Sequence, residues 1–375
     1  MSGQKGMTEV SGVKVYKYFA GGEWQSARGD RVFDVYRPYD RALFARVAAG
    51  GSEEARIAVA AAANAFPAWS QTTPAERAKL FFKAAEIVKR RRTEIADILA
   101  LETGSTISFA TFQQDLVAAT IEQAAGWMYL PKGEVLESNV PEVHSIAVRR
   151  PLGVVASFTP WNGANVLSWR AVLSPVAAGN TVVVKPSEFG NVRVRSANFS
   201  RNSRAILRCT TARHDNIGPL ITPAAVKLVD DRVKEAVAKG AILHAGGSFE
   251  GQIYQPTILS NVPLDAAVAN EETFGPVVAV EVVDTAEQAV EAANRTMYGL
   301  TSSILARDTY KAFELAPKVL AGIVNVNSPT VNDEIHAPMG GVRDSGWGRT
   351  GPDSLKEFQD VIWINSHSGQ RQYPF

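Results

Sequence analysis

Two short apolar runs, one on each side of a helical pattern, constrain the fold of this chain more than any other feature. Residues 153–158 and 181–184 are long enough only for strands and have no polar face, so both sides of each strand must be buried. Between them, residues 166–178 carry apolar side chains at helical spacing. A strand, a helix and a strand in so few residues form one parallel βαβ unit. The sequence therefore predicts an α/β fold.

The same alternation of strands and helices returns later in the chain, and a mainly helical part precedes the βαβ unit. Residues 13–48 carry short alternating runs around glycines, which predict an edge hairpin. Apolar spacing of three and four then predicts helices over 52–69, 73–101 and 108–129. Towards the carboxyl end the patterns predict helices over 223–239, 285–295 and 309–319 and strands over 241–245, 276–283, 300–306 and 322–327.

Composition excludes several classes of protein. At roughly 150 residues per domain, 375 residues favour two or three domains. A formal charge of +1 gives no broad field for nucleic acid or an anionic membrane, and no run of apolar residues has the length of a membrane helix. The amino terminus has no apolar core of the secretory type. A single cysteine, Cys209, fits a reducing cytoplasm.

The segment 190–216 differs from the rest of the chain. It holds six arginines, no lysine and no sustained periodicity, although an α/β pattern stands on each side of it. A basic loop that binds phosphate is one interpretation. An irregular connector is the other, and the missing periodicity favours it. We therefore predict an irregular junction at 190–216.

Polar and aromatic side chains follow both strands of the predicted βαβ unit. Trp161 and Asn162 come after the first strand, and Lys185 and Glu188 after the second. Ligands of parallel sheets bind beyond the carboxyl ends of the strands. The Asn162 amide can donate a hydrogen bond to a developing oxyanion, and Lys185 and Glu188 can hold ribose hydroxyls. Solvated Lys and Glu also occur in such loops, so this alternative stays open.

Three other chemistries find little support. Residues 346–351 match GxGxxG, but no strand is predicted before them and too little chain follows to complete a βαβ unit. The five histidines have no metal-ligand spacing, and there is no GxSxG elbow for a serine nucleophile. The sequence therefore disfavours both metal catalysis and serine hydrolysis.

Several longer motifs stand in order along the chain: PLGVVASFTPWNGAN, AGNTVVVKPSE, NEETFGPVVAV, YGLTSSILARD, AGIVNVNS and MGGVRDSGWGR. Together they resemble the aldehyde dehydrogenase superfamily. The resemblance covers roughly residues 15–188 and 217–365. The stretch NSPTVNDEIHAPMGGVRDSGWGRTG looks most like the branch that acts on aromatic aldehydes such as salicylaldehyde, vanillin or benzaldehyde.

This resemblance implies roles for six residues. Asn162 matches the family's oxyanion-hole asparagine, and Trp161 the cofactor-side wall beside it. The adenosine-ribose contacts correspond to Lys185 and Glu188, where a carboxylate favours NAD over NADP. The pair that holds the nicotinamide ribose corresponds to Glu272 and Phe274. The substrate implied is a small-molecule aldehyde.

The resemblance also implies a division into three domains. The cofactor-binding domain comprises 1–137 and 153–189, and the catalytic domain 217–360. Residues 138–152 and 361–375 are the oligomerisation elements of a homo-oligomer, and the strands at 141–150 and 361–365 are expected to pair across subunits. The fold expected is thus a truncated Rossmann-like cofactor domain, an α/β catalytic domain and a small oligomerisation hairpin.

The departure from the family pattern lies between Glu188 and Ile217. Members of the family have a far longer stretch there, with the rest of the Rossmann sheet, the pyrophosphate-binding helix start, a glutamate base and the nucleophilic cysteine. This sequence has none of these motifs. Arg208 beside Cys209 could lower the pKa of that thiol, but nothing aims the thiol at Asn162. We therefore expect either an NAD-dependent aldehyde dehydrogenase with impaired catalysis or a non-catalytic, oligomer-forming homologue.

Overall fold

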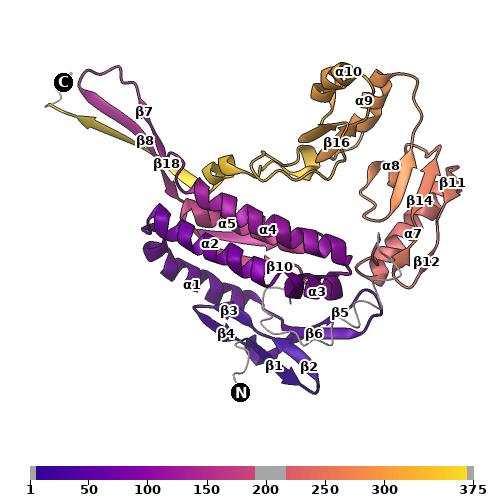
Figure 1. Ribbon diagram of the computed structural model, residues 1–375, viewed down its shortest axis with the longest axis horizontal. Coiled ribbons are helices and arrows are strands. Elements are labelled where there is room, and N and C mark those ends of the chain that lie inside the picture. Colours follow the sequence, from indigo (N-terminus) through magenta and orange to yellow (C-terminus); the bar gives the residue numbers. More distant parts are fainter. Residues whose placement is uncertain (1–5, 191–216, 370–375) are drawn as a thin grey trace.

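The structure is a computed structural model that describes residues 6–190 and 217–369. The predicted irregular junction therefore lies almost wholly outside the described residues, together with Cys209. The described part confirms the α/β class, with helices and several small sheets (Figure 1).

Short strands form the amino-terminal end of the chain. The order of the first sheet is β1-β2-β6-β5, and a separate hairpin joins β3 to β4. The hairpin confirms the predicted strand, turn and strand, because Gly21 and Gly22 adopt positive φ values at its turn. The strands are β1 (Met7–Val10), β2 (Val13–Tyr16), β3 (Tyr18–Ala20), β4 (Glu23–Gln25), β5 (Val32–Tyr36) and β6 (Leu43–Ala48).

A helical layer follows, and it has one more helix than the sequence predicts. Apolar spacing runs on through residues 73–101, but the helix breaks at Arg91, where φ is −97° and ψ is 12°. The Arg91 side chain pairs with Glu94 at 2.9 Å at the start of the new helix. The four helices are α1 (Ser52–Ser70), α2 (Pro74–Arg90), α3 (Arg92–Thr103) and α4 (Ile107–Trp127).

The predicted βαβ unit is confirmed, but the prediction that both faces of its strands are buried is wrong, because Phe158 of the first strand is 76% exposed and Val184 of the second 41%. Strands β9 (Val154–Thr159) and β10 (Thr181–Pro186) are parallel, with α5 (Ala164–Ala178) between them. Thr181 lies opposite Val154, so the two strands end level with each other. Helices α1 and α5 both contact the strands. Among the described residues no third strand joins this sheet, so each strand has one free edge.

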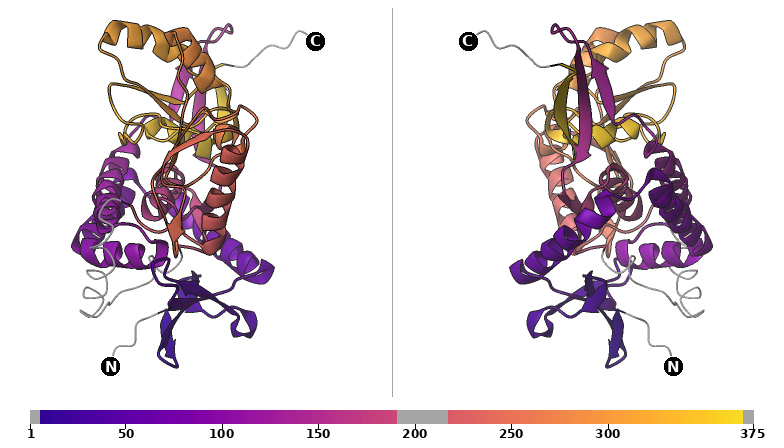
Figure 2. Two further views of the ribbon diagram at one scale, coloured as in Figure 1. Left: turned by 90° about the vertical axis from the view of Figure 1, so that its right-hand side faces the viewer. Right: turned by 90° about the vertical axis from the view of Figure 1, so that its left-hand side faces the viewer.

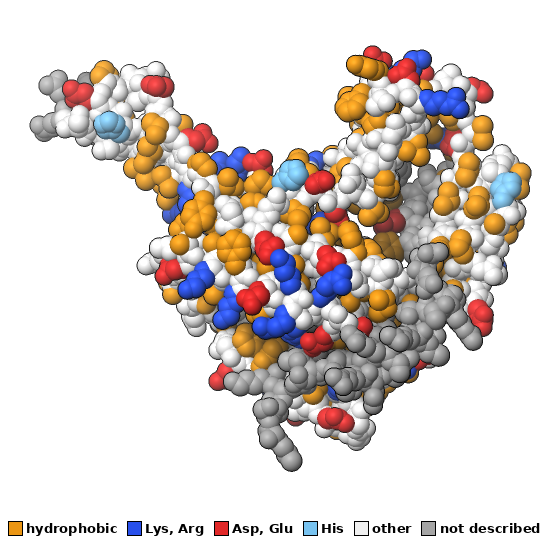
Figure 3. All heavy atoms as spheres, viewed as in Figure 1, with side chains coloured by type: hydrophobic (Ala, Val, Ile, Leu, Met, Phe, Trp, Pro, Cys, Tyr) orange, Lys and Arg blue, Asp and Glu red, His pale blue; other side chains and the backbone are white. Residues whose placement is uncertain are grey.

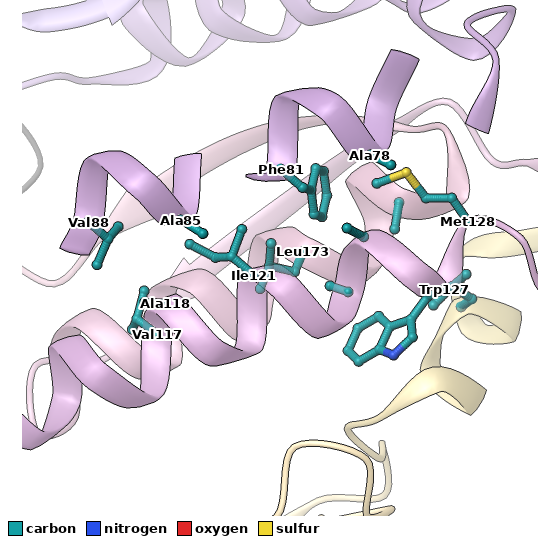
Figure 4. Packing of buried hydrophobic residues seen from close by; sticks show 14 of the residues in the cluster. Ala78, Phe81, Ala85, Val88, Val117, Ala118, Ile121, Trp127, Met128 and Leu173 are labelled. Atoms are coloured by element: carbon teal, nitrogen blue, oxygen red, sulfur yellow. The ribbon is translucent and has the colours of Figure 1, made fainter. Parts of the chain in front are cut away.

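The largest hydrophobic core lies between α2, α4 and α5 (Figure 4). Small residues alternate with large ones along the facing helices, and this lets the helices approach closely and fill the space between them. Figure 4 shows Phe81 of α2 and Leu173 of α5 turned towards Ile121 of α4. The core also includes Ala78, Ala85, Val88, Val117, Ala118, Ala124, Ala125, Trp127, Met128, Val166, Ala177, Ala178 and Leu355.

The carboxyl-terminal region contains two smaller α/β units. In the first, β14 pairs with β11 and β15, and helix α7 packs on the strands. The sequence predicted β11 and β15 but missed β14, whose four residues sit among turn residues. This unit comprises α7 (Pro223–Ala238), β11 (Ile242–Ala245), β12 (Phe249–Glu250), β13 (Ile253–Tyr254), β14 (Thr257–Ser260), α8 (Ala267–Asn270) and β15 (Val277–Val280).

The second unit is a parallel pair of strands with a helix between them. Its elements agree with the prediction except that the helix expected over 309–319 stops at Leu315, and a 3-10 turn follows. Pro317 explains the stop, because it has no backbone N–H to continue the helix. The elements are α9 (Ala286–Asn294), β16 (Thr301–Ile304), α10 (Thr309–Leu315) and β17 (Ile323–Val326).

A three-stranded arm projects from the helical layer (Figure 1). It consists of β7 (Gly133–Leu136), β8 (Val143–Pro151) and β18 (Gln359–His367), in the order β18-β8-β7. The expectation that the strands at 141–150 and 361–365 pair across subunits is wrong, because β8 and β18 pair antiparallel within one chain over their whole length. Nine residues of each strand are paired, so the edges that face each other have no free backbone N–H or C=O group with which to pair with a second subunit.

The regions form an open arrangement. In both side views the amino-terminal strands and the lobe with α9 and α10 lie at opposite ends (Figure 2). The surface is hollowed between that lobe and the arm (Figure 3). Among the described residues, no helix is both long and apolar enough to cross a membrane.

Candidate functional site

The ends of β9 and β10 bring four predicted residues to one edge of the sheet. Lys185 pairs with Phe158 in the parallel register, so the loops after both strands leave from the same level. Trp161 and Asn162 lie in the first loop. In the second, the Lys185 ammonium lies 3.5 Å from a Glu188 carboxylate oxygen. This is the grouping that the sequence predicted for a ligand-binding edge.

The Lys185–Glu188 pair is well exposed, with 63% and 59% of the side chains accessible. The pKa of the Glu188 carboxyl lies below its usual value, mainly because the backbone N–H of Glu188 itself donates to it and further because Lys185 is close. The carboxylate is therefore charged at neutral pH. Both residues line a cavity of about 820 Å³ between α1, the β3–β4 hairpin and β10.

A second cavity, of about 610 Å³, lies beside Trp161 and Asn162. Phe109 and Phe112 line it from the first turns of α4, with ring centroids 6.4 Å apart and ring planes 21° from parallel. Thr106 caps this helix by accepting a hydrogen bond from the Phe109 backbone N–H. Residues three apart share a helix face, which brings both rings to the cavity. Sequence reasoning missed them, although their spacing indicated a shared face.

The loop that carries Asn162 is tied to helix α4 through a buried residue. Three positions on, the Asn165 amide donates to the Gln114 side-chain oxygen at 2.5 Å, and the Asn165 backbone N–H donates to Gln113 at 3.3 Å. Asn165 is buried, whereas Asn162 is exposed. The start of α5 is thereby fixed while the Asn162 amide stays accessible from the cavity.

One aromatic contact joins this edge to the carboxyl-terminal region. The rings of Trp161 and Phe274 meet edge to face, with centroids 5.3 Å apart at 66°. Phe274 has a φ of +52°, which is uncommon for a residue with a bulky side chain. Two residues predicted from separate motifs are thus in contact. The Lys185–Glu188 pair lines a different cavity from Trp161 and Asn162, so the predicted residues fall into two adjoining groups.

Glu272 lies two residues before Phe274 on a loop that Arg232 of α7 holds. The Arg232 guanidinium donates to the Glu272 backbone carbonyl and pairs with the Glu271 carboxylate. Among the described residues, no hydrogen bond or ion pair engages the Glu272 carboxylate itself. Sequence reasoning missed Arg232, since nothing in a helical pattern shows which loop will cross the helix.

A third cavity, of about 360 Å³, lies between α4, α5 and the glycine-rich loops of residues 334–351. Arg170 of α5 lines it and pairs with Asp333 at 2.8 Å, and these side chains are only 15% and 19% exposed. The sequence held no indication of this pair, because 163 residues separate the two partners.

The structure also bears on the GxGxxG match and on metal binding. A 3-10 turn (Arg343–Ser345), not a strand, precedes the GxGxxG match at 346–351, which confirms that this match is no dinucleotide fingerprint. Within residues 6–190 and 217–369, no group of three His, Cys, Asp or Glu side chains is placed to hold a metal ion.

Comparison with known proteins gives a family match over most of the chain. The model of the aldehyde dehydrogenase family matches residues 24–196 and 205–364. Among curated proteins, a vanillin dehydrogenase from Pseudomonas fluorescens is 30% identical over 474 residues, covering 94% of this chain and 98% of the relative. A salicylaldehyde dehydrogenase from Pseudomonas putida is 24% identical over 480 residues, covering 96% and 99%.

Solved structures agree on the fold. A salicylaldehyde dehydrogenase from Pseudomonas putida G7, solved with salicylaldehyde, superposes with a TM-score of 0.87 at 23% identity and covers 96% of this chain and 99% of its own. The 474 positions aligned with the vanillin dehydrogenase exceed the 375 residues of this chain. That relative therefore has stretches with no counterpart here.

Proposed function

Because the chain belongs to the aldehyde dehydrogenase family, we propose that it binds NAD and an aromatic aldehyde but that its oxidation of the aldehyde to the carboxylic acid is impaired. The observation that carries this proposal is the Trp161–Phe274 contact. It brings the strand-end loop with Asn162 against the loop with Glu272, so the predicted aldehyde and nicotinamide contacts become neighbours.

The residues present fit the two riboses of NAD. A charged Glu188 carboxylate with Lys185 at 3.5 Å can accept from and donate to the hydroxyls of the adenosine ribose. Its negative charge repels a 2′-phosphate, which favours NAD over NADP. The Glu272 carboxylate, which no described residue engages, can accept from the hydroxyls of the nicotinamide ribose. NAD, when bound, supplies a hydride acceptor beside the aldehyde carbon.

The cavity beside Asn162 fits an aromatic aldehyde. About 610 Å³ is enough for a small ring compound, and Phe109, Phe112 and Trp161 offer apolar faces to it. The exposed Asn162 amide can donate a hydrogen bond to the carbonyl oxygen. Support for this substrate class also comes from the names of the relatives, which are vanillin, salicylaldehyde and benzaldehyde dehydrogenases.

Catalysis is impaired in this proposal because a covalent step lacks its nucleophile. Without the family's nucleophilic cysteine, no tetrahedral adduct forms for the Asn162 amide to stabilise. The family's cysteine and glutamate motifs belong between Glu188 and Ile217, where this sequence has neither. The sequence around the lone thiol, Cys209, predicts no turn that would aim it at Asn162. The proposed location is the cytoplasm, where one unpaired cysteine stays reduced.

Calorimetric titration tests the cofactor half of the proposal. NAD should bind more tightly than NADP, and Glu188→Gln should remove most of that difference because the repulsion of the 2′-phosphate is lost. The pyrophosphate-binding helix start of the family is missing, so NAD affinity should be about 10²- to 10⁴-fold weaker than with an intact site. Tighter binding of NADP by the unaltered chain would contradict the role of Glu188.

We also propose that the chain forms a homo-oligomer through the arm. Strand β18 pairs on one side only among the described residues, so its other edge offers unpaired backbone groups. Trp363 and Ile364 on that strand are 67% and 44% exposed. Sedimentation at micromolar concentration should show a dimer or larger species, and Ile364→Lys should weaken it. A clean monomer of the unaltered chain would contradict the proposal.

A further inference from the structure

The loop of residues 271–276 is fastened to helix α7 by one arginine with two partners. One Arg232 nitrogen donates to the Glu272 backbone carbonyl, and another pairs with the Glu271 carboxylate. The Arg232 side chain is only 13% exposed, whereas that of Glu271 is 58% exposed. The guanidinium therefore lies beneath the loop and not beside it. A planar fork of donors can bind two acceptors at once in a fixed geometry.

The loop also lies directly on α7 without room for a side chain between them. A Cβ added at Gly275 would come within 2.7 Å of a Val229 methyl carbon. On the other side, the Thr257 backbone N–H at the start of β14 donates to the Pro276 carbonyl at 2.8 Å. The end of the loop is thus held by packing and by the sheet. At its beginning, the Glu271 backbone N–H donates to the Ala267 carbonyl at 2.8 Å, and Arg232 binds the Glu272 carbonyl and the Glu271 carboxylate.

The backbone carbonyl and the side-chain carboxylate of Glu272 have different roles. The backbone carbonyl is bound by Arg232, while no described residue engages the carboxylate. Two residues later, Phe274 reaches Trp161 across the gap between the two regions. If the start of this loop shifted, the Glu272 carboxylate would move relative to the contact between the Trp161 and Phe274 rings, which lies beside the proposed nicotinamide site.

We propose that Arg232 is a positioning residue that holds the Glu272 carboxylate where it binds the nicotinamide ribose. This inference rests on the proposed function, because it takes Glu272 to be a cofactor contact. Arg232 acts only through the loop, so removing it should affect the nicotinamide half of the cofactor and leave the adenosine half unchanged.

The test uses the two halves of NAD as separate probes. Nicotinamide mononucleotide contains the ribose assigned to Glu272, and adenosine monophosphate the ribose assigned to Lys185 and Glu188. In NMR titrations, which suit weak ligands, Arg232→Ala should weaken the first probe about tenfold and change the second by less than about twofold, because a charged hydrogen bond to the loop is lost. Arg232→Lys should recover part of the loss, since one ammonium can replace one of the two contacts.

Arg295→Ala is the matched control. Arg295 pairs with Glu281 in the same region, and among the described residues no hydrogen bond or ion pair joins it to a predicted site residue, so both probes should bind as they do to the unaltered chain. Equal weakening of both probes by Arg232→Ala, or no weakening of the mononucleotide, would overturn the positioning role. Failure of the unaltered chain to bind the mononucleotide would instead refute the assignment of Glu272, and the inference with it.

Discussion

The amino-terminal region, residues 6–190, and the carboxyl-terminal region, residues 217–358, are packed very differently. One continuous core joins α2, α4 and α5 of the first region and also takes in Leu355 of the second. The second has a smaller core around α7, and outside it large apolar side chains reach the surface. They include Val278 of β15, Val282 and Tyr310 of α10, which are 58%, 89% and 88% exposed.

The difference follows from the helices and not from the sheets. A parallel sheet is stable when helices cover both of its faces, and each region holds a parallel sheet of only two strands, β9 with β10 and β16 with β17. The amino-terminal helices bury one another and need few strands, so that region keeps its core. Among the described residues, β16 and β17 each have one free edge. Burial, and with it stability, should therefore concentrate in the amino-terminal region.

The largest effect should come from opening a cavity in the amino-terminal core. Leu173 of α5 is 2% exposed and packs against α4, whereas Leu305 after β16 is 77% exposed. Leu173→Ala should lower the free energy of unfolding by about 2–5 kcal/mol, because buried contacts are lost and a void remains. Leu305→Ala should change it by less than about 0.5 kcal/mol. Urea unfolding monitored by circular dichroism measures both free energies. Equal losses would show that the two regions are packed equally well.

A smaller difference in stability is expected between substitutions of two glycines that lie at helix ends. Gly179 ends α5 and Gly240 follows α7, with φ values of +100° and +110°. A Cβ at Gly179 would come within 2.8 Å of the buried Arg77 guanidinium, whereas at Gly240 it would meet no atom within 4 Å. Gly179→Ala should therefore cost about 1–3 kcal/mol more than Gly240→Ala, since only the first displaces packed atoms. Thermal unfolding of the two variants checks the difference.

The smallest effect concerns acid stability. Backbone N–H groups of Arg28 and Gly51 donate to the Glu54 carboxylate at 2.7 and 2.6 Å and hold its pKa at about 2. Because this pKa is lowered by folding, the carboxylate stabilises the fold above its unfolded pKa of roughly 4.3, and this contribution is lost as pH falls towards 2.

Glu54→Gln should therefore lower the melting temperature at neutral pH. Near pH 2 the melting temperature of the variant should approach that of the unaltered chain. Glu281→Gln is the control from the carboxyl-terminal region, since the exposed Glu281–Arg295 pair should contribute little. Melting temperatures across this pH range measure both variants. A constant difference between Glu54→Gln and the unaltered chain at every pH would show that the charge of Glu54 is not what matters.

Local patterns predicted most of the helices and the βαβ unit, since the buried faces repeat along the chain. They could not predict the break at Arg91, because apolar spacing runs through it while the backbone turns. The pairing of β8 with β18 joins residues about 210 apart, and no local pattern specifies a strand's partner.

The sequence predicted the grouping of candidate residues at the strand ends. Trp161, Asn162, Lys185 and Glu188 were found because the carboxyl ends of parallel strands meet at one edge. Arg232 and the Arg170–Asp333 pair were missed, since they depend on which loop crosses which helix. Such contacts arise from tertiary packing and leave no trace in spacing.

We propose that this chain keeps the residues that bind NAD and the aldehyde and lacks the residues that carry the reaction. Formation of NADH from NAD and benzaldehyde, followed by absorbance and compared with the Cys209→Ser variant, tests it most directly. The NAD-linked benzaldehyde dehydrogenase of Pseudomonas putida serves as the active control. We predict no turnover above that of Cys209→Ser, although NAD binds. Steady NADH formation that Cys209→Ser abolishes would contradict the claim.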